Sequence, residues 1–356
     1  MNAEEYGLST IYTMADVRKT LEYVESHEFE KWFEPYPGIK MVFYMNGHLI
    51  GAATTLIHIS VQGYDPIDIL ATGDYKKDNI FFSVKELPKW VLDLPLTIIT
   101  ESTYGYADSK EVAKPVFANN VVKMLENHNL IFIPVFSLAR GQEILYVLKQ
   151  MQLNGMLDKS IPIYADGKLF LDYCNLYRFT LDIDDEMREF YPANLNYMNK
   201  DMRETIIKSH MKKIILSTSG MANHGPAQEY IPKIVEKADT CIHFVGYQAP
   251  GTLGRKLIEA KENELVEMGD YVRKKKCTVL TTGEFSTHAK RDELLEFYKK
   301  FSKIRTLLIQ HGEESVKYSF AEYCRNHLNN CKTVEVLGTG NTVSIDEWGL
   351  VKLIKE

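Results

Sequence analysis

The chain has 356 residues, 45% of them hydrophobic and 25% charged, which are ordinary proportions for a globular protein large enough for two domains. A net charge of −6 argues against a protein that coats nucleic acid over its whole surface, but it leaves room for a confined basic channel. No stretch reaches the roughly 18 consecutive apolar residues of a membrane-spanning helix. The amino terminus lacks the basic and apolar regions of a secretion signal, so we expect a cytoplasmic protein without membrane contact.

The first hundred residues predict a helix followed by a group of strands. Apolar residues repeat at helical spacing in residues 16–30, and strands are expected at residues 40–44, 53–60, 67–71 and 94–100. His48 and Asp74 lie in the breaks around these strands, and Glu101 follows the last strand. The spacing allows His48 and Asp74 to reach the same end of one sheet.

From about residue 106 the pattern changes to alternating helices and buried strands. Strands are expected at residues 130–136, 161–165, 212–218 and 241–247, and helices at residues 110–127, from Ser137 as a cap, from about residue 226, and at residues 253–259. This alternation predicts an open parallel sheet with its loops at one edge. Residues 182–204 are richer in polar and aromatic residues, and we expect a lid or a connecting helix there.

The segment from residue 283 to 313 is expected to place two histidines at one edge of a sheet. A turn carries Ser286 and His288, a helix follows, and an apolar strand at residues 306–309 ends next to His311 and a glycine. A buried strand that ends in this way presents an imidazole at the carboxyl edge of an α/β sheet, where ligands collect.

Nine short motifs follow one another in the same order as in a known protein family and extend over nearly the full chain. They are GHLIGAA, TGDY, ESTYG, IPVFSLARGQEIL, IPIY, SGM followed by GPA, GYQAPGTLGRKL, FSTHAKRDEL and QHGEE. With them the chain resembles the β-CASP branch of the metallo-β-lactamase superfamily, zinc-dependent nucleases that include the pre-mRNA 3′-end cleavage endonuclease. The resemblance implies an α/β fold: a partial metallo-β-lactamase αββα sandwich (residues 1–106 and 266–356) with an inserted parallel-sheet β-CASP domain (residues 107–265).

The resemblance also implies a zinc site. His48 would be the metal-binding histidine of the third lactamase motif, Asp74 the aspartate that bridges two zinc ions, and His311 a further zinc ligand. Imidazole and carboxylate are ligands that suit zinc. Two bridged ions would activate a water molecule and stabilise the negative charge that develops on a phosphodiester during attack.

The remaining roles that the resemblance implies concern the substrate. Glu101 would be the acid of the first β-CASP motif, which orients a ligand histidine, and His288 would lie near the scissile phosphate as a catalytic group. Ser286, Ser219 and Gly220 would lie close to the phosphate backbone. The substrate implied is single-stranded RNA.

One departure from the family pattern concerns the main metal motif. The sequence contains no His-x-His-x-Asp-His, and the 47 residues before His48 match the part of the family that follows this motif. Three explanations compete: Met1 is an internal methionine of a longer or interrupted gene, the missing half is another chain, or the fragment has lost catalysis and kept RNA binding. We expect the chain to be incomplete alone and to need a separate amino-terminal half or a homo-oligomer.

Three functions follow from these observations. The leading hypothesis is a zinc-dependent RNA phosphodiesterase. The alternative is a catalytically inactive RNA-binding or scaffold protein derived from the same family. A metallohydrolase of small esters or thioesters is a third hypothesis, which the large inserted domain disfavours.

Overall fold

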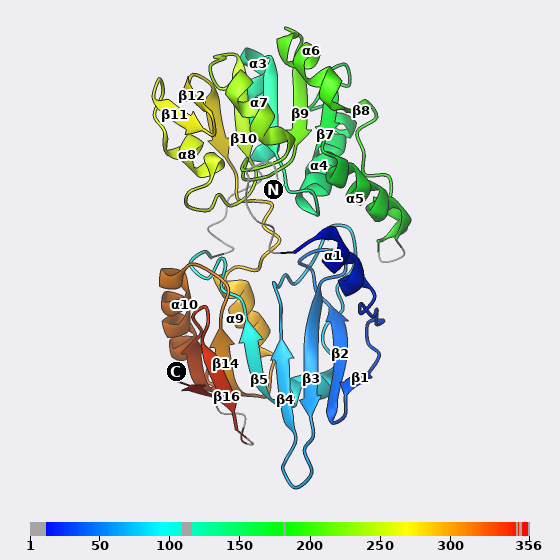
Figure 1. Ribbon diagram of the computed structural model, residues 1–356, viewed down its shortest axis with the longest axis vertical. Helices are drawn as coiled ribbons and strands as arrows, with labels where there is room; N and C mark the ends of the chain where they lie inside the picture. The colour runs from blue at the N-terminus through cyan, green and yellow to red at the C-terminus, as the bar shows by residue number, and fades with distance from the viewer. Residues whose placement is uncertain (1–11, 109–115, 181–182, 347, 349–350, 355–356) are drawn as a thin grey trace.

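The computed structural model describes residues 12–108, 116–180, 183–346, 348 and 351–354. Two sheets form two lobes along the long axis of the molecule, with the inserted six-stranded sheet at one end and the seven-stranded sheet at the other (Figure 1). None of the helices within these residues is both long enough and apolar enough to cross a membrane.

The seven-stranded sheet is mixed. Its strands, in spatial order, are β1 (Phe33–Tyr36), β2 (Ile39–Met45), β3 (Ala53–Ile59), β4 (Ile67–Ala71), β5 (Pro95–Thr100), β14 (Lys303–Ile309) and β15 (Cys331–Val336). The first four strands pair antiparallel, whereas β4, β5, β14 and β15 run parallel to one another. The segments after β2, β4, β5 and β14 therefore leave the sheet at the same edge.

One face of this sheet is covered by helices. A single core joins alternate strand residues such as Leu56, Leu70 and Ile98 to helices α2 (Lys89–Leu92), α9 (Arg291–Lys299) and α10 (Glu314–His327). Helix α1 is shorter than the sequence pattern predicts: it spans Met14–Leu21, and none of its residues is buried. It therefore lacks the packing that usually stabilises a surface helix.

The six-stranded sheet is entirely parallel. Its strands, in spatial order, are β13 (Thr278–Thr281), β10 (Thr240–Phe244), β6 (Leu130–Pro134), β9 (Lys213–Ser217), β7 (Ile163–Asp166) and β8 (Leu195–Tyr197). Helices cover both faces, with α3 (Phe117–Asn127), α4 (Arg140–Leu153) and α5 (Lys168–Phe179) in one core and α6 (Arg203–Lys208), α7 (Pro226–Ile234) and α8 (Leu253–Glu259) in the other. Every residue of β6, β9 and β10 is buried, as their predominantly apolar sequences predict.

The α/β fold class predicted from the sequence is confirmed, but two local predictions are wrong. Ser137 does not cap α4: the helix begins at Arg140 after Ala139, which has a φ of 66° and makes no side-chain cap. The segment 182–204 is not a lid, because its described part supplies the edge strand β8 between 3-10 turns at Asp185–Met187 and Lys200–Met202.

Two smaller features complete the fold. Hairpins are formed by β11 (Leu265–Met268) with β12 (Tyr271–Lys274) and by β16 (Thr342–Ile345) with β17 (Val351–Ile354). Because β13 pairs with β10, the six-stranded sheet continues past residue 265, where the sequence places the end of the inserted domain. The domain boundaries themselves stay a prediction.

Candidate metal-dependent active site

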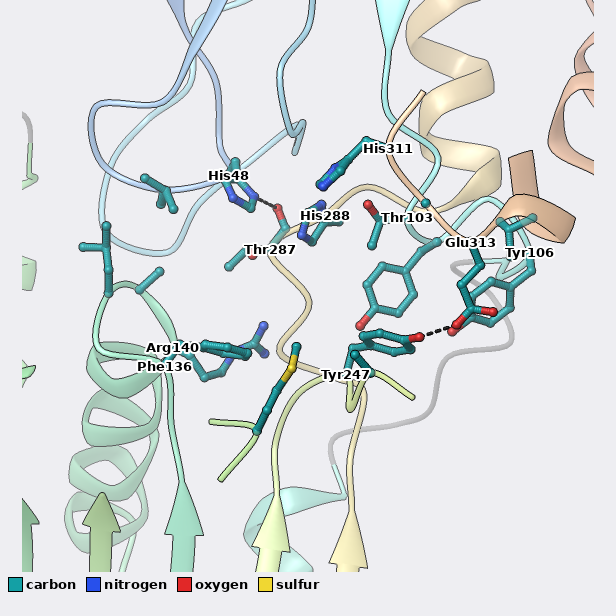
Figure 2. A pocket seen from close by; sticks show the side chains of 18 of the residues that line it. His48, Thr103, Tyr106, Phe136, Arg140, Tyr247, Thr287, His288, His311 and Glu313 are labelled. Atoms are coloured by element: carbon teal, nitrogen blue, oxygen red, sulfur yellow. Dashed lines mark hydrogen bonds between the residues drawn. The ribbon is translucent and has the colours of Figure 1, made fainter. Parts of the chain in front are cut away.

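Five of the predicted site residues converge on one edge of the seven-stranded sheet. His48, Asp74, Glu101 and His311 follow the carboxyl ends of β2, β4, β5 and β14, and His288 lies on the loop between β13 and α9. The ring centroids of His48 and His288 are 4.6 Å apart, and those of His288 and His311 are 6.2 Å apart. Figure 2 shows the three imidazoles side by side at the top of a cavity.

The loop of His48 is tied to the loop of Asp74 by Asn46, a residue to which the sequence analysis gave no role. The buried Asn46 amide donates to the carbonyls of Thr72 (3.0 Å) and Asp74 (3.1 Å), and its oxygen accepts from the His48 amide (3.0 Å). A Cβ on Gly47 would lie 2.3 Å from the carbonyl oxygen of Asp78, so only glycine fits this close approach. These contacts place the His48 imidazole 3.6 Å from the Asp74 carboxylate.

His311 reaches the same carboxylate from the other side. Its Nδ1 lies 2.6 Å from Asp74 Oδ1, and its side chain is 57% exposed. The backbone turns sharply here, because His311 has a φ of 51° and its carbonyl accepts from the Ser102 amide at 2.8 Å. A Cβ on Gly312, whose φ is 147°, would lie 2.7 Å from the Ser102 hydroxyl. The glycine after His311 thus allows the turn that directs the imidazole to Asp74.

Glu101 holds His288. Its carboxylate is 1% exposed; Oε2 lies 2.7 Å from His288 Nδ1, and Oε1 accepts from the Tyr75 amide at 2.6 Å. The Ser286 hydroxyl accepts from the His288 amide and donates to its carbonyl. Because a carboxylate only accepts, His288 Nδ1 carries a proton, which leaves Nε2 free on the other side of the ring. The acid therefore orients His288, which the resemblance places beside the phosphate rather than among the metal ligands.

His48 is arranged as a neutral imidazole. Its Nδ1 donates to the carbonyl of Thr287 at 2.9 Å, so the unprotonated Nε2 faces Asp74. Burial lowers the pKa of His48 below its ordinary value, which keeps the ring unprotonated near neutral pH. A neutral imidazole with its second nitrogen held in a hydrogen bond is the form that binds a metal ion.

The cluster offers donor types that suit zinc. Two groups of potential ligands share Asp74: one adds His48 and His288, and the other adds Glu101 and His311. Two imidazoles and a carboxylate give the three protein ligands of a catalytic zinc site, which leaves a fourth position for water or substrate.

The cluster forms one wall of a cavity of about 600 Å³ between the two sheets. The opposite wall comes from the carboxyl edge of the six-stranded sheet: Phe136 follows β6, Arg140 begins α4, Met221 follows β9 and Tyr247 follows β10. The Tyr247 hydroxyl donates to the Glu313 carboxylate, a hydrogen bond that joins the two walls (Figure 2). The two sheets thus face each other with the edges at which α/β proteins bind ligands.

These opposite-wall residues could not be assigned a role from the sequence, although Phe136, Arg140 and Tyr247 lie within the motifs IPVFSLARGQEIL and GYQAPGTLGRKL. Ser219 and Gly220 lie behind the wall next to Met221, and both are buried. A Cβ on Gly220 would lie 2.9 Å from the Phe136 ring. The phosphate contacts predicted for Ser219, Gly220 and Ser286 stay predictions.

Histidines and carboxylates on the loops of a mixed sheet, facing a cavity beneath an inserted parallel sheet, define a candidate metallohydrolase. Two sequence families match the chain. One, described as the Beta-Casp domain, matches residues 141–257, and the other, described as the Zn-dependent metallo-hydrolase RNA specificity domain, matches residues 273–336.

Relatives cover most of the chain. An RNase J-like protein of Methanocaldococcus jannaschii is 30% identical in an alignment of 341 residues that covers 94% of this chain and 78% of that protein. The transcription termination factor FttA of Methanosarcina mazei is 28% identical over 94% of this chain and 56% of its own length, and that of M. jannaschii is 28% identical over 91% and 53%. The chain thus spans about half the length of these FttA relatives. It belongs to the β-CASP family of the metallo-β-lactamase superfamily.

Proposed function

We propose that the chain is a zinc-dependent RNA phosphodiesterase. The observation that carries the proposal is that His48, His288 and His311 line one wall of a single cavity, while the carboxylates of Asp74 and Glu101 contact these histidines. Metal ligands and an oriented imidazole within a few ångströms of one another are the two parts that hydrolysis of a phosphodiester requires.

The metal ligands in this proposal are His48, Asp74 and His311. Asp74 lies between the two imidazoles, 3.6 Å from His48 Nε2 and 2.6 Å from His311 Nδ1. These three residues would hold a zinc ion, which would supply a bound water of pKa about 7 and a positive charge for a phosphoryl oxygen. The hydrogen bond from His48 to the Thr287 carbonyl fixes the tautomer that this role needs.

His288 acts on the substrate. Its Nδ1 is held by Glu101, so its Nε2 is the atom that faces a phosphate in the cavity. When protonated, Nε2–H donates to a phosphoryl oxygen and then gives its proton to the leaving oxygen of the cleaved bond. The buried carboxylate of Glu101 stabilises the imidazolium before this transfer.

Single-stranded RNA is the substrate in this proposal. The match to a domain described as an RNA specificity domain and the names of the relatives support RNA as the polymer. The cavity supports a single strand, because its opposite wall carries aromatic rings on which unpaired bases can stack. Ser219, Gly220 and Ser286 are proposed to lie near the phosphate backbone.

Cleavage of an end-labelled, unstructured oligoribonucleotide tests the function. After chelation and dialysis, the full chain should cut the RNA when zinc is restored and should leave it intact in the presence of chelator. A chromogenic ester serves as a second substrate. Hydrolysis of the ester without any RNA cleavage would contradict the proposal and favour a small-molecule hydrolase.

The number of ligands favours a second candidate, an RNA-binding protein without catalysis. The sequence lacks the His-x-His-x-Asp-His motif that supplies most metal ligands in the family, so we propose that the full centre takes further ligands from a separate polypeptide or a second copy of the chain. The zinc content of the chain separates the candidates. A single bound equivalent with slow RNA cleavage supports the enzyme, and less than one equivalent with RNA bound but uncut supports the binding protein.

A further inference from the structure

The cavity wall opposite the histidines contains a buried cation that the proposed chemistry does not use. Arg140, the first residue of α4, lines the cavity although it is only 7% exposed. Figure 2 shows its guanidinium directed into the cavity, with His48, His288 and His311 on the far side. Its position depends on β6 and α4, elements of the six-stranded sheet, and therefore not on the loops that carry the metal ligands.

The guanidinium makes few hydrogen bonds to the described part of the protein. It has five N–H donors, and among the described residues one bond is found, from Nη1 to the Val245 carbonyl at 3.1 Å. Its Nε has no partner within the described part of the chain. The Glu143 carboxylate is 3.8 Å from Nε, too far for a hydrogen bond, and its own Oε2 is also without a described partner.

A buried charge in this state is costly until an anion completes its bonds. Burial lowers the pKa of Arg140 and raises that of Glu143, so the surroundings compensate the cation poorly. The open side of the guanidinium faces the cavity, where a ligand can reach it. A guanidinium offers a planar fork of donors that matches the oxygens of a phosphate.

Resting on the function proposed above, we propose that Arg140 binds a backbone phosphate of the RNA strand, separate from the phosphate at the histidine cluster. The strand would lie across the cavity, with one phosphate beside His288 and another at Arg140. Phe136 and Tyr247, on the same wall, give a base a surface to stack on. A base reaches these rings only when it is unpaired, so this subsite selects a single strand.

The salt dependence of RNA binding distinguishes this role from a purely structural one. Binding of a fluorescein-labelled oligouridylate is measured by anisotropy in EDTA, so that no cleavage occurs, at several salt concentrations. Arg140→Met should weaken binding roughly tenfold and reduce the slope of log K against log salt by about 0.7, the value for one phosphate contact on a single strand. Arg140→Lys should weaken binding less and keep the slope, because it keeps the charge and loses the fork.

A matched control is Arg178→Met, which removes an arginine of the same lobe that pairs with Glu189 on the surface. It should leave both affinity and slope unchanged. A folded Arg140→Met protein with the slope of the wild type would overturn the proposal. If that variant does not fold, Arg140→Lys decides, and an affinity equal to the wild type would overturn it. Because the assay contains no metal, a failure of the proposed catalysis would appear only in the cleavage assay.

Discussion

The two sheets of this protein differ in how completely they are covered. In the six-stranded sheet both faces of β6, β9 and β10 are buried in separate helix-covered cores. In the seven-stranded sheet Val42 and Leu56 enter a helix-covered core, whereas their neighbours Met41 and Ile57, which pair with each other on the opposite face, stay partly exposed.

The two sheets therefore differ in their roles. The six-stranded sheet is a complete scaffold that holds one wall of the cavity in place. The seven-stranded sheet carries the catalytic candidates on its loops and keeps an apolar face that is only partly covered. Partly exposed apolar faces of this kind are typical of surfaces that bind another polypeptide, which supports the proposal that a separate polypeptide or a second copy completes the centre.

The largest effect is expected from Asp74→Asn. The carboxylate lies between His48 and His311, so its loss should remove bound zinc and lower RNA cleavage by roughly 10³-fold, because several kcal/mol of charge stabilisation disappear. Asp68→Asn is the matched control: Asp68 lies near the amino end of β4 and contacts His58 at 2.8 Å, whereas Asp74 follows the carboxyl end of that strand. Equal losses in both variants would contradict the assignment of the site to one edge.

His288→Ala should have the next largest effect. Because Glu101 and not a metal ion holds its Nδ1, cleavage should fall by roughly 10²-fold while the zinc content stays unchanged. Zinc content is measured together with single-turnover cleavage of labelled RNA. Loss of zinc in this variant would show that His288 is a ligand.

His243 makes the six-stranded sheet sensitive to acid. It is fully buried in β10 and stacks on Phe117, and its ring nitrogens have no partner in the described part of the chain. Burial lowers its pKa from 6.5 to about 4. Below pH 6.5 this histidine therefore binds a proton in the unfolded chain but not in the folded chain. The free energy of unfolding falls as the pH drops from 6.5 toward about 4, and it levels off below that pH.

Between about pH 7 and about pH 5, this histidine should cost about 2 kcal/mol of unfolding free energy. Urea titrations at both pH values measure the loss, and His243→Phe should remove that part of it. Hydrogen exchange should show the loss in the six-stranded sheet. An identical pH dependence in the variant would mean that other groups cause the acid sensitivity.

The smallest effect is expected on the partly exposed face. Ile57→Thr should change the unfolding free energy by less than about 1 kcal/mol, because the side chain is not fully removed from water. Ile98→Thr, in the helix-covered core, should cost several times more. Similar losses for the two variants would show that both faces of the seven-stranded sheet are equally well packed.

The sequence predicted the α/β fold class and the sheet edge at which the candidate site residues meet. The strand-end residues His48, Asp74, Glu101 and His311 could be placed at one edge because each follows an apolar run, and parallel strands end at the same edge. The contact between Glu101 and His288 could not be predicted, because it depends on a loop that returns from the lobe of the six-stranded sheet.

Other features needed tertiary information. Strand β8 lies in a polar segment that pairs only at the edge of the sheet, so no apolar run marks it. The role of Asn46 depends on two carbonyls more than twenty residues away. In the sequence, Arg140 lies in a helical pattern that would equally suit a surface arginine. Its position on the cavity wall is visible only in the folded structure.

The rate of RNA cleavage as a function of added zinc shows whether the histidine and aspartate cluster is a catalytic zinc centre. Metal-free chain is titrated with zinc, and single-turnover cleavage of an end-labelled single strand is followed. We expect the rate to rise from the background and to reach a plateau at a single equivalent per chain, with no rise for Asp74→Asn. Cleavage that is independent of zinc, or an uncut strand in the presence of zinc-loaded chain, would contradict the account.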